Sequence, residues 1–87
     1  MGKKNATKRR ITAPEAARAA AEYYQHVTGN WQQRPTLEEI ELNEDQSRWL
    51  VTLGVYSEDA PFGERAYKRF EVDVYTGEVL SMKIRKV

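Results

Sequence analysis

The 87-residue chain contains no cysteine, only one histidine and no long apolar run. Without cysteine it can form neither a disulfide framework nor a thiolate metal site. His26 cannot build a zinc site alone, because such sites need several nitrogen or sulfur ligands. No segment reaches the roughly 20 apolar residues that a membrane-spanning helix needs. We therefore expect no metal, no cofactor and no membrane insertion, and a soluble, cytoplasmic protein.

Charge is unevenly distributed along the chain. Residues 1–12 contain no acidic residue and five basic ones, which are Lys3, Lys4, Lys8, Arg9 and Arg10. The other 75 residues carry nine basic and thirteen acidic groups, a net charge of about −4. We expect residues 1–11 to form a disordered basic tail and residues 12–87 to form one domain, since a chain of this length builds a single modest core.

A capping box predicts where a helix begins. The Thr12 hydroxyl can accept a hydrogen bond from an early backbone N–H, and Glu15 can reach back to the N–H of Thr12. The helix should span residues 13 to about 28, because Gly29 tolerates the left-handed conformation that ends many helices. Its expected core stripe consists of Ala16, Ala20, Tyr23 or Tyr24, and Val27.

Alternating apolar and polar residues predict four strands after the helix. The clearest are residues 48–56 and a hairpin of residues 66–75 and 78–86 that turns at Thr76-Gly77. A weaker, glutamate-rich strand is expected around residues 37–42. The apolar face should collect Trp49, Val51, Leu53, Val55, Phe70, Val72, Val74, Leu80, Met82 and Ile84. One helix covering that face gives an α+β fold, an N-terminal helix packed on a four-stranded antiparallel meander in the order α-β-β-β-β.

The opposite face of the predicted sheet is the candidate interaction surface. Tyrosines and apolar residues among paired charges are enriched at protein interfaces, although a solvated face with cross-strand charge pairs would look the same. By alternation, the candidate partner-binding residues on this face are Leu50, Tyr56, Tyr67, Arg69, Tyr75 and Val79. The last strand could also pair with a second copy of the chain, which would give a homodimer. The sequence therefore predicts a protein-interaction or ligand-binding module whose partner is another protein or itself.

The basic tail suggests an alternative function. Nucleic acid or another polyanion could bind, through counterion release, to Lys3, Lys4, Lys8, Arg9 and Arg10. A solubilising arm explains these residues more simply, and the acidic body argues against a protein that coats DNA.

The sequence predicts no catalytic site. His26 has no serine or cysteine motif beside it, and a histidine near a helix C-terminus is commonly a favourably placed cation. Glu71 and Asp73 share a strand face, but paired carboxylates need a cleft, which a helix-on-sheet domain of this size rarely provides. An acidic run on and after the first strand comprises Glu38, Glu39, Glu41, Glu44 and Asp45. It could bind a divalent cation or a basic partner, but charge that protects an edge strand from aggregation explains it better.

The end of the chain resembles a known family. An alanine-rich helix is followed by strands and then by the pattern Phe70-x-Val72-x-Val74-x-x-Gly77-Glu78-Val79-Leu80. Over most of residues 13–87 the sequence is similar to a PepSY-type domain. That resemblance implies a small non-enzymatic module linked to peptidase inhibition, signalling or ligand binding. Many such domains are secreted or membrane-attached, and the lack of an export signal in this chain departs from that pattern.

A second resemblance is to the O-type accessory proteins of gas vesicles. It depends on the basic, alanine-rich helix ending at Thr28-Gly29, on the strand Arg48-Trp49-Leu50-Val51, and on the late strand Phe70-Glu71-Val72 before a glycine turn. The resemblance implies a cytoplasmic accessory or assembly protein with vesicle subunits as partners. The chain departs from that family at its end, where an arginine- and tyrosine-rich close is missing.

Overall fold

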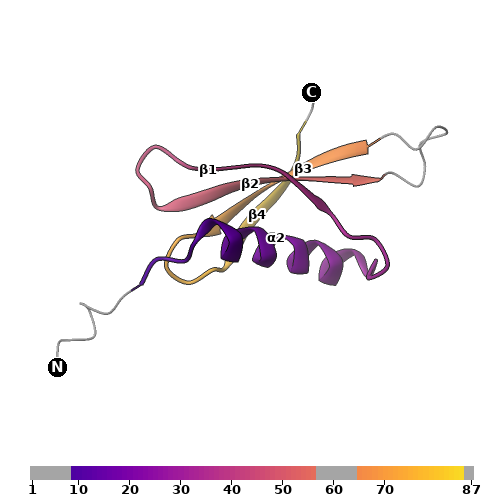
Figure 1. Ribbon diagram of the computed structural model, residues 1–87, viewed down its shortest axis with the longest axis horizontal. Coiled ribbons are helices and arrows are strands. Elements are labelled where there is room, and N and C mark those ends of the chain that lie inside the picture. Colours follow the sequence, from indigo (N-terminus) through magenta and orange to yellow (C-terminus); the bar gives the residue numbers. More distant parts are fainter. Residues whose placement is uncertain (1–8, 57–64, 86–87) are drawn as a thin grey trace.

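One helix lies against one face of a four-stranded sheet (Figure 1) in the computed structural model, which describes residues 9–56 and 65–85. The elements are α2 (Ala13–Thr28), β1 (Thr36–Leu42), β2 (Arg48–Tyr56), β3 (Arg65–Asp73) and β4 (Val79–Arg85). All neighbouring strands are antiparallel, and their order across the sheet is β1-β2-β3-β4. The predicted α+β fold with α-β-β-β-β order is therefore confirmed.

The ends of α2 form as the sequence predicts. The Thr12 hydroxyl accepts a hydrogen bond from the Glu15 N–H at 3.3 Å, and the Glu15 carboxylate accepts one from the Thr12 N–H at 2.8 Å. Gly29 ends the helix in the left-handed region with φ 70°, and its N–H donates to the Gln25 carbonyl. These contacts satisfy backbone groups that the first and last turns leave without helical partners.

The segment just before α2 is held to the sheet. The Ile11 N–H donates to the Val74 carbonyl at 2.7 Å, and the Trp49 indole N–H donates to the Ile11 carbonyl at 3.1 Å. The Ile11 side chain packs against the buried core. Ile11, which the sequence predicts to lie in the tail, therefore contacts the domain.

The core lies between α2 and the two central strands. Ala16 and Ala20 are fully buried, which lets the helix backbone approach the sheet closely. The predicted sheet residues that are buried are Val51, Leu53, Val55, Phe70, Val72 and Val74. Trp49 and Met82 are half-buried against this cluster.

The structure decides which of Tyr23 and Tyr24 belongs to the core stripe of the helix, and whether Val27 does. Tyr24 is buried at 7% exposure, whereas Tyr23 is 37% exposed, and its ring forms a T-shaped pair with Phe70 at a centroid distance of 6.4 Å. Val27 is 48% exposed, so its prediction as a core residue was wrong.

Two predicted core residues of β4 are also exposed, Leu80 at 42% and Ile84 at 70%. A helix is about 10 Å wide, whereas neighbouring strands are about 4.8 Å apart. One helix therefore cannot cover all four strands, and the outer strand β4 keeps apolar side chains in solvent. The prediction that both residues are buried was wrong for this geometric reason.

Candidate interaction surface

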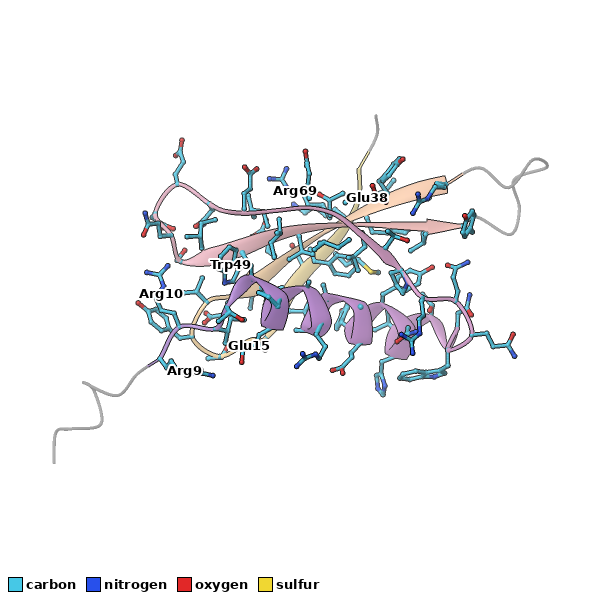
Figure 2. All side chains as sticks on the ribbon, in the orientation of Figure 1. Arg9, Arg10, Glu15, Glu38, Trp49 and Arg69 are labelled. Atoms are coloured by element: carbon cyan, nitrogen blue, oxygen red, sulfur yellow. The ribbon has the colours of Figure 1, made fainter. Side chains whose placement is uncertain are left out.

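The sheet face opposite α2, called here the open face, has no covering element among the described residues. Figure 2 shows Glu38 and Arg69 pointing away from the helix on this side. Directly paired residues of neighbouring strands lie on the same face of the sheet. The strand register therefore shows which other residues lie on the open face. One row across the open face is Glu41, Leu50, Glu71 and Ser81, and the next is Glu39, Thr52, Arg69 and Lys83.

Four of the six predicted partner-binding residues come together on the open face. Leu50 and Tyr67 are half-buried, Arg69 is exposed, and Tyr56 is 57% exposed. Their strand partners place them in adjacent rows of β2 and β3. The structure thus gathers an apolar residue, two tyrosines and an arginine on one surface, and their role in binding stays a prediction.

Opposite charges divide the open face across the strands. β1 presents glutamates and β4 presents Lys83, whereas β3 presents Glu71 as well as Arg69. Ion pairs cross the strands from Arg48 to Glu71 at 2.7 Å and from Arg65 to Glu38 at 2.9 Å. Each of these four side chains is between 29% and 47% exposed, so each pair contributes roughly 0.2–1 kcal/mol.

Gly54 makes room for one of these ion pairs. A Cβ atom at this position would lie 2.7 Å from the Glu38 carboxylate and 2.9 Å from the Arg65 guanidinium. The same guanidinium lies over the Tyr56 ring, 5.5 Å from its centroid. Sequence reasoning missed Glu38 and Arg65 as parts of this face. The available signal was the opposite charge of Glu38 and Arg65, but their pairing across β2 needed the strand register.

Val79 does not lie on the open face, contrary to the alternation drawn from the sequence. The β3–β4 register pairs Glu71 with Ser81 and then Val72 with Val79, so Leu80 is the extra residue of a β-bulge. Because Val72 is fully buried on the helix side, its partner Val79 also lies there and packs against the core. The placement of Val79 as an open-face residue was wrong.

Tyr75 lies in the β3–β4 turn and not on a strand. β3 ends at Asp73, whose carboxylate accepts hydrogen bonds from the N–H groups of Tyr75 at 2.8 Å and Thr76 at 2.9 Å. These two hydrogen bonds lower the pKa of Asp73 below its ordinary value, and the bond from Thr76 has the larger effect. Gly77 completes the turn with φ 76°. Tyr75 therefore lies outside the strand rows that form the open face, because a side-chain cap ends the strand two residues earlier than predicted.

Two of the five predicted polyanion-binding residues lie in the described part of the chain, and both contact the domain. Arg9 forms an exposed ion pair with Glu15 at 3.3 Å. Arg10 donates to the Gln46 carbonyl at 2.6 Å, and its guanidinium lies 5.9 Å from the centroid of the Tyr75 ring. Lys3, Lys4 and Lys8 lie outside the described residues.

The acidic run does not gather into one site. Glu38 pairs with Arg65, whereas Asp45 accepts hydrogen bonds from the Ser47 hydroxyl and N–H, which lower the pKa of Asp45. Within residues 9–56 and 65–85, no three His, Cys, Asp or Glu side chains are grouped so that they could hold a metal ion. His26 is exposed, and its ring lies edge-on to Trp31 at a centroid distance of 6.3 Å.

A comparison with protein-family models, curated proteins and solved structures found no match for the chain. The resemblances to PepSY-type domains and to gas vesicle accessory proteins therefore stay predictions. In the part of the chain that the structure describes, α2 is neither long nor apolar enough to cross a bilayer.

Proposed function

We propose that the protein is a non-enzymatic, cytoplasmic protein-interaction module that binds another protein through the open face of its sheet. The observation that carries this proposal is the uncovered face itself. It presents Leu50, Tyr67 and Arg69 in adjacent rows of β2 and β3 while α2 occupies the other side. Tyrosine and arginine are among the residues that contribute most to binding energy at protein interfaces.

The charge pattern of the open face favours a protein over a polyanion. Glu39 lies in the same row as Arg69 and Lys83, and Glu41 lies in the adjacent row. The open face therefore presents charges of both signs close together. A phosphate backbone would be repelled by the β1 glutamates, whereas a protein surface can offer complementary charges of both signs. The partner we expect therefore has an apolar centre flanked by a basic and an acidic side.

The test is a comparison of two double variants. Tyr67→Ala with Arg69→Ala removes the centre of the open face, and Arg18→Ala with Glu22→Ala changes the exposed side of α2 as a matched control. A partner is first captured from the native host with the wild-type chain, and its dissociation constant is then measured by calorimetry. We expect the open-face variant to weaken binding by at least about tenfold and the control to leave it unchanged. Equal affinity of all three proteins would contradict the proposal.

Other results of the same capture would support the alternatives. RNA or heparin binding that disappears when residues 3–10 lose their basic side chains, and that weakens steeply with salt, would favour the polyanion-binding alternative. Gas vesicle subunits among the captured proteins would favour the accessory role, and a peptidase would favour a PepSY-type role.

A further inference from the structure

The two edges of the sheet differ in charge. The outer strand β1 carries three exposed glutamates, at positions 38, 39 and 41, and its register shifts between Leu37 and Glu39. Charged side chains and bulges both keep an edge strand from pairing with another chain, and β4 has a bulge of its own at Leu80. The other edge, β4, contains no acidic residue and no proline between Val79 and Arg85. Only β4 therefore presents an edge without acidic protection.

The backbone direction of β4 follows from the neighbouring strand. The Asp73 N–H donates toward the β4 side, to the Glu78 carbonyl, and the Val74 N–H donates toward the β2 side, to the Ser47 carbonyl. Backbone groups alternate in direction along a strand, so Glu71 also faces β4, and its partner Ser81 faces β3. By the same alternation Met82 and Ile84 present their N–H and C=O groups to the free edge.

Apolar side chains are exposed beside that free edge. They are Tyr23 at 37%, Leu80 at 42% and Ile84 at 70%, and we call them the β4 strip. Ile84 pairs with Lys68 and shares the helix-side face with Met82. Tyr23 and Val79 line one hollow between α2 and the end of β4. Among the residues that the structure describes, no strand pairs with the outer edge of β4, and the exposed apolar side chains of the β4 strip lie beside it.

We propose that a second copy of the chain pairs with β4, so that two sheets join into one continuous antiparallel sheet of eight strands. The two-fold axis passes through Met82, the central residue of Val79–Arg85. Leu80 of each copy then lies opposite Ile84 of the other, and both α2 helices cover the same side of the joined sheet. The β4 strip of each copy fills the space between the two helices.

Side-chain complementarity selects this register. With Met82 opposite itself, Lys83 of one copy lies opposite Ser81 of the other, in the row that also contains Glu71. The Ser81 Oγ is buried and makes no hydrogen bond to any of the described residues, and the Lys83 ammonium brings a donor to it. The Lys83 charge also approaches the carboxylate of Glu71 across the short serine.

Neighbouring registers are less favourable. A shift of two residues in one direction places Lys83 opposite Lys83, and like charges in direct opposition destabilise a strand pair. A shift in the other direction places Ile84 opposite Glu78, which lies in the turn before β4. Self-association at β4 leaves the open face of each copy exposed, so it does not depend on the proposed function.

A single engineered thiol tests the register. The chain has no cysteine, so Met82→Cys introduces its only one. Directly opposed residues whose backbones face each other have Cα atoms about 5.5 Å apart, within the usual span of a disulfide. We expect Met82→Cys to form a covalent dimer rapidly under mild oxidation, and Arg18→Cys, on the exposed side of α2, to form no disulfide-linked dimer. Equal cross-linking of the two variants would overturn the proposal.

Two further variants test the interface without adding a bond. Ile84→Pro removes an N–H that points to the free edge and so leaves the β3–β4 ladder intact. Lys83→Glu places a carboxylate in the row of Glu71 from the second copy. Sedimentation equilibrium should give a mass of twice 10.1 kDa for the wild type and for the charge-matched control Arg18→Glu. Each β4 variant should raise the dimer dissociation constant by at least about tenfold.

Circular dichroism of each monomer shows whether a variant has kept its fold, and Lys83 is exposed, so its replacement leaves the core unchanged. A wild-type chain that stays monomeric up to millimolar concentration would overturn the proposal. So would a dimer that both β4 variants leave intact. Loss of partner binding by the Tyr67 and Arg69 variant with the dimer retained separates the two proposals.

Discussion

Single polar side chains decide where several elements end. Asp73 stops β3 because its carboxylate accepts two backbone N–H groups of the turn, and Thr12 starts α2 by the same kind of contact. Trp49 fastens the segment before the helix through one hydrogen bond to Ile11. Each of these side chains satisfies backbone groups that the regular elements leave unpaired. The effect of replacing them is therefore local and measurable.

Asp73 provides a prediction on acid stability. Hydrogen bonds from Thr76 and Tyr75 lower the pKa of Asp73 in the folded chain, so the ionised carboxylate stabilises the fold at neutral pH. That contribution is fully present above the unfolded pKa, near 3.9, and is lost as the pH falls through the lower folded value. We expect Asp73→Asn, which cannot titrate, to lose less thermal stability than the wild type between about pH 5 and pH 2. Thermal unfolding followed by circular dichroism measures both slopes.

A second variant controls for the turn itself. Asparagine keeps an acceptor oxygen for the turn N–H groups, whereas Asp73→Ala removes both acceptor and charge. Asp73→Ala should therefore be less stable than Asp73→Asn at neutral pH, with a similarly shallow acid slope. An Asp73→Asn protein with the full wild-type acid slope would show that other carboxyl groups dominate.

In strand β4, one extra residue changes which side chains face the core. The bulge at Leu80 turns Val79 toward the helix, and it leaves Leu80 at the edge of the sheet. Alternation counted back from Met82 without a bulge would place Leu80 in the core and Val79 on the open face. Val79 therefore packs against the core, where alternation would place Leu80, and Leu80 is 42% exposed.

Two matched substitutions measure this difference. Val79→Asp should destabilise the fold by roughly 2 kcal/mol or more, because it places a charge against the apolar core. Leu80→Asp should cost less than about 1 kcal/mol, since that side chain is already 42% exposed. Urea unfolding, at a concentration low enough to keep the chain monomeric, gives both values. A larger loss for Leu80→Asp would mean that β4 alternates without the bulge.

In the described part of the chain, only one face of the sheet is packed against another element, and that face is only partly covered. One helix covers the centre of one face, the open face has no cover among the described residues, and the edge strand β4 is only partly sheltered. Apart from Ala16 and Ala20 of α2, the fully buried side chains accordingly lie on the central strands β2 and β3, together with Val74 just after β3. Stability should therefore decrease from the centre of the sheet toward its edges.

Native-state hydrogen exchange measures that gradient. We expect the amides of Val51 and Phe70, at fully buried positions of β2 and β3, to exchange only through global unfolding. Amides of β1, such as that of Ile40, should exchange faster through local opening, because every residue of that strand is at least partly exposed. Uniform protection across all four strands would contradict this gradient.

Most of the fold can be predicted because its signals are local. The capping box of Thr12 and Glu15 and the glycine at position 29 specify both ends of α2 within a few residues. The alternation in residues 48–56 identifies β2 from end to end. The candidate site is less predictable. Leu50, Tyr56, Tyr67 and Arg69 follow simple alternation, whereas Tyr75 and Val79 depend on a turn cap and a bulge that alternation does not show.

The amino-acid order was enough to establish the helix, the number of strands and their succession, because capping and alternation act between residues close together in the chain. Packing between distant segments decided the rest. It selected Tyr24 over Tyr23, left Val27 and Ile84 in solvent, and joined Ile11 to Val74 and Trp49. Those outcomes depend on where one helix crosses a wider sheet, and this geometry exists only once the chain has folded.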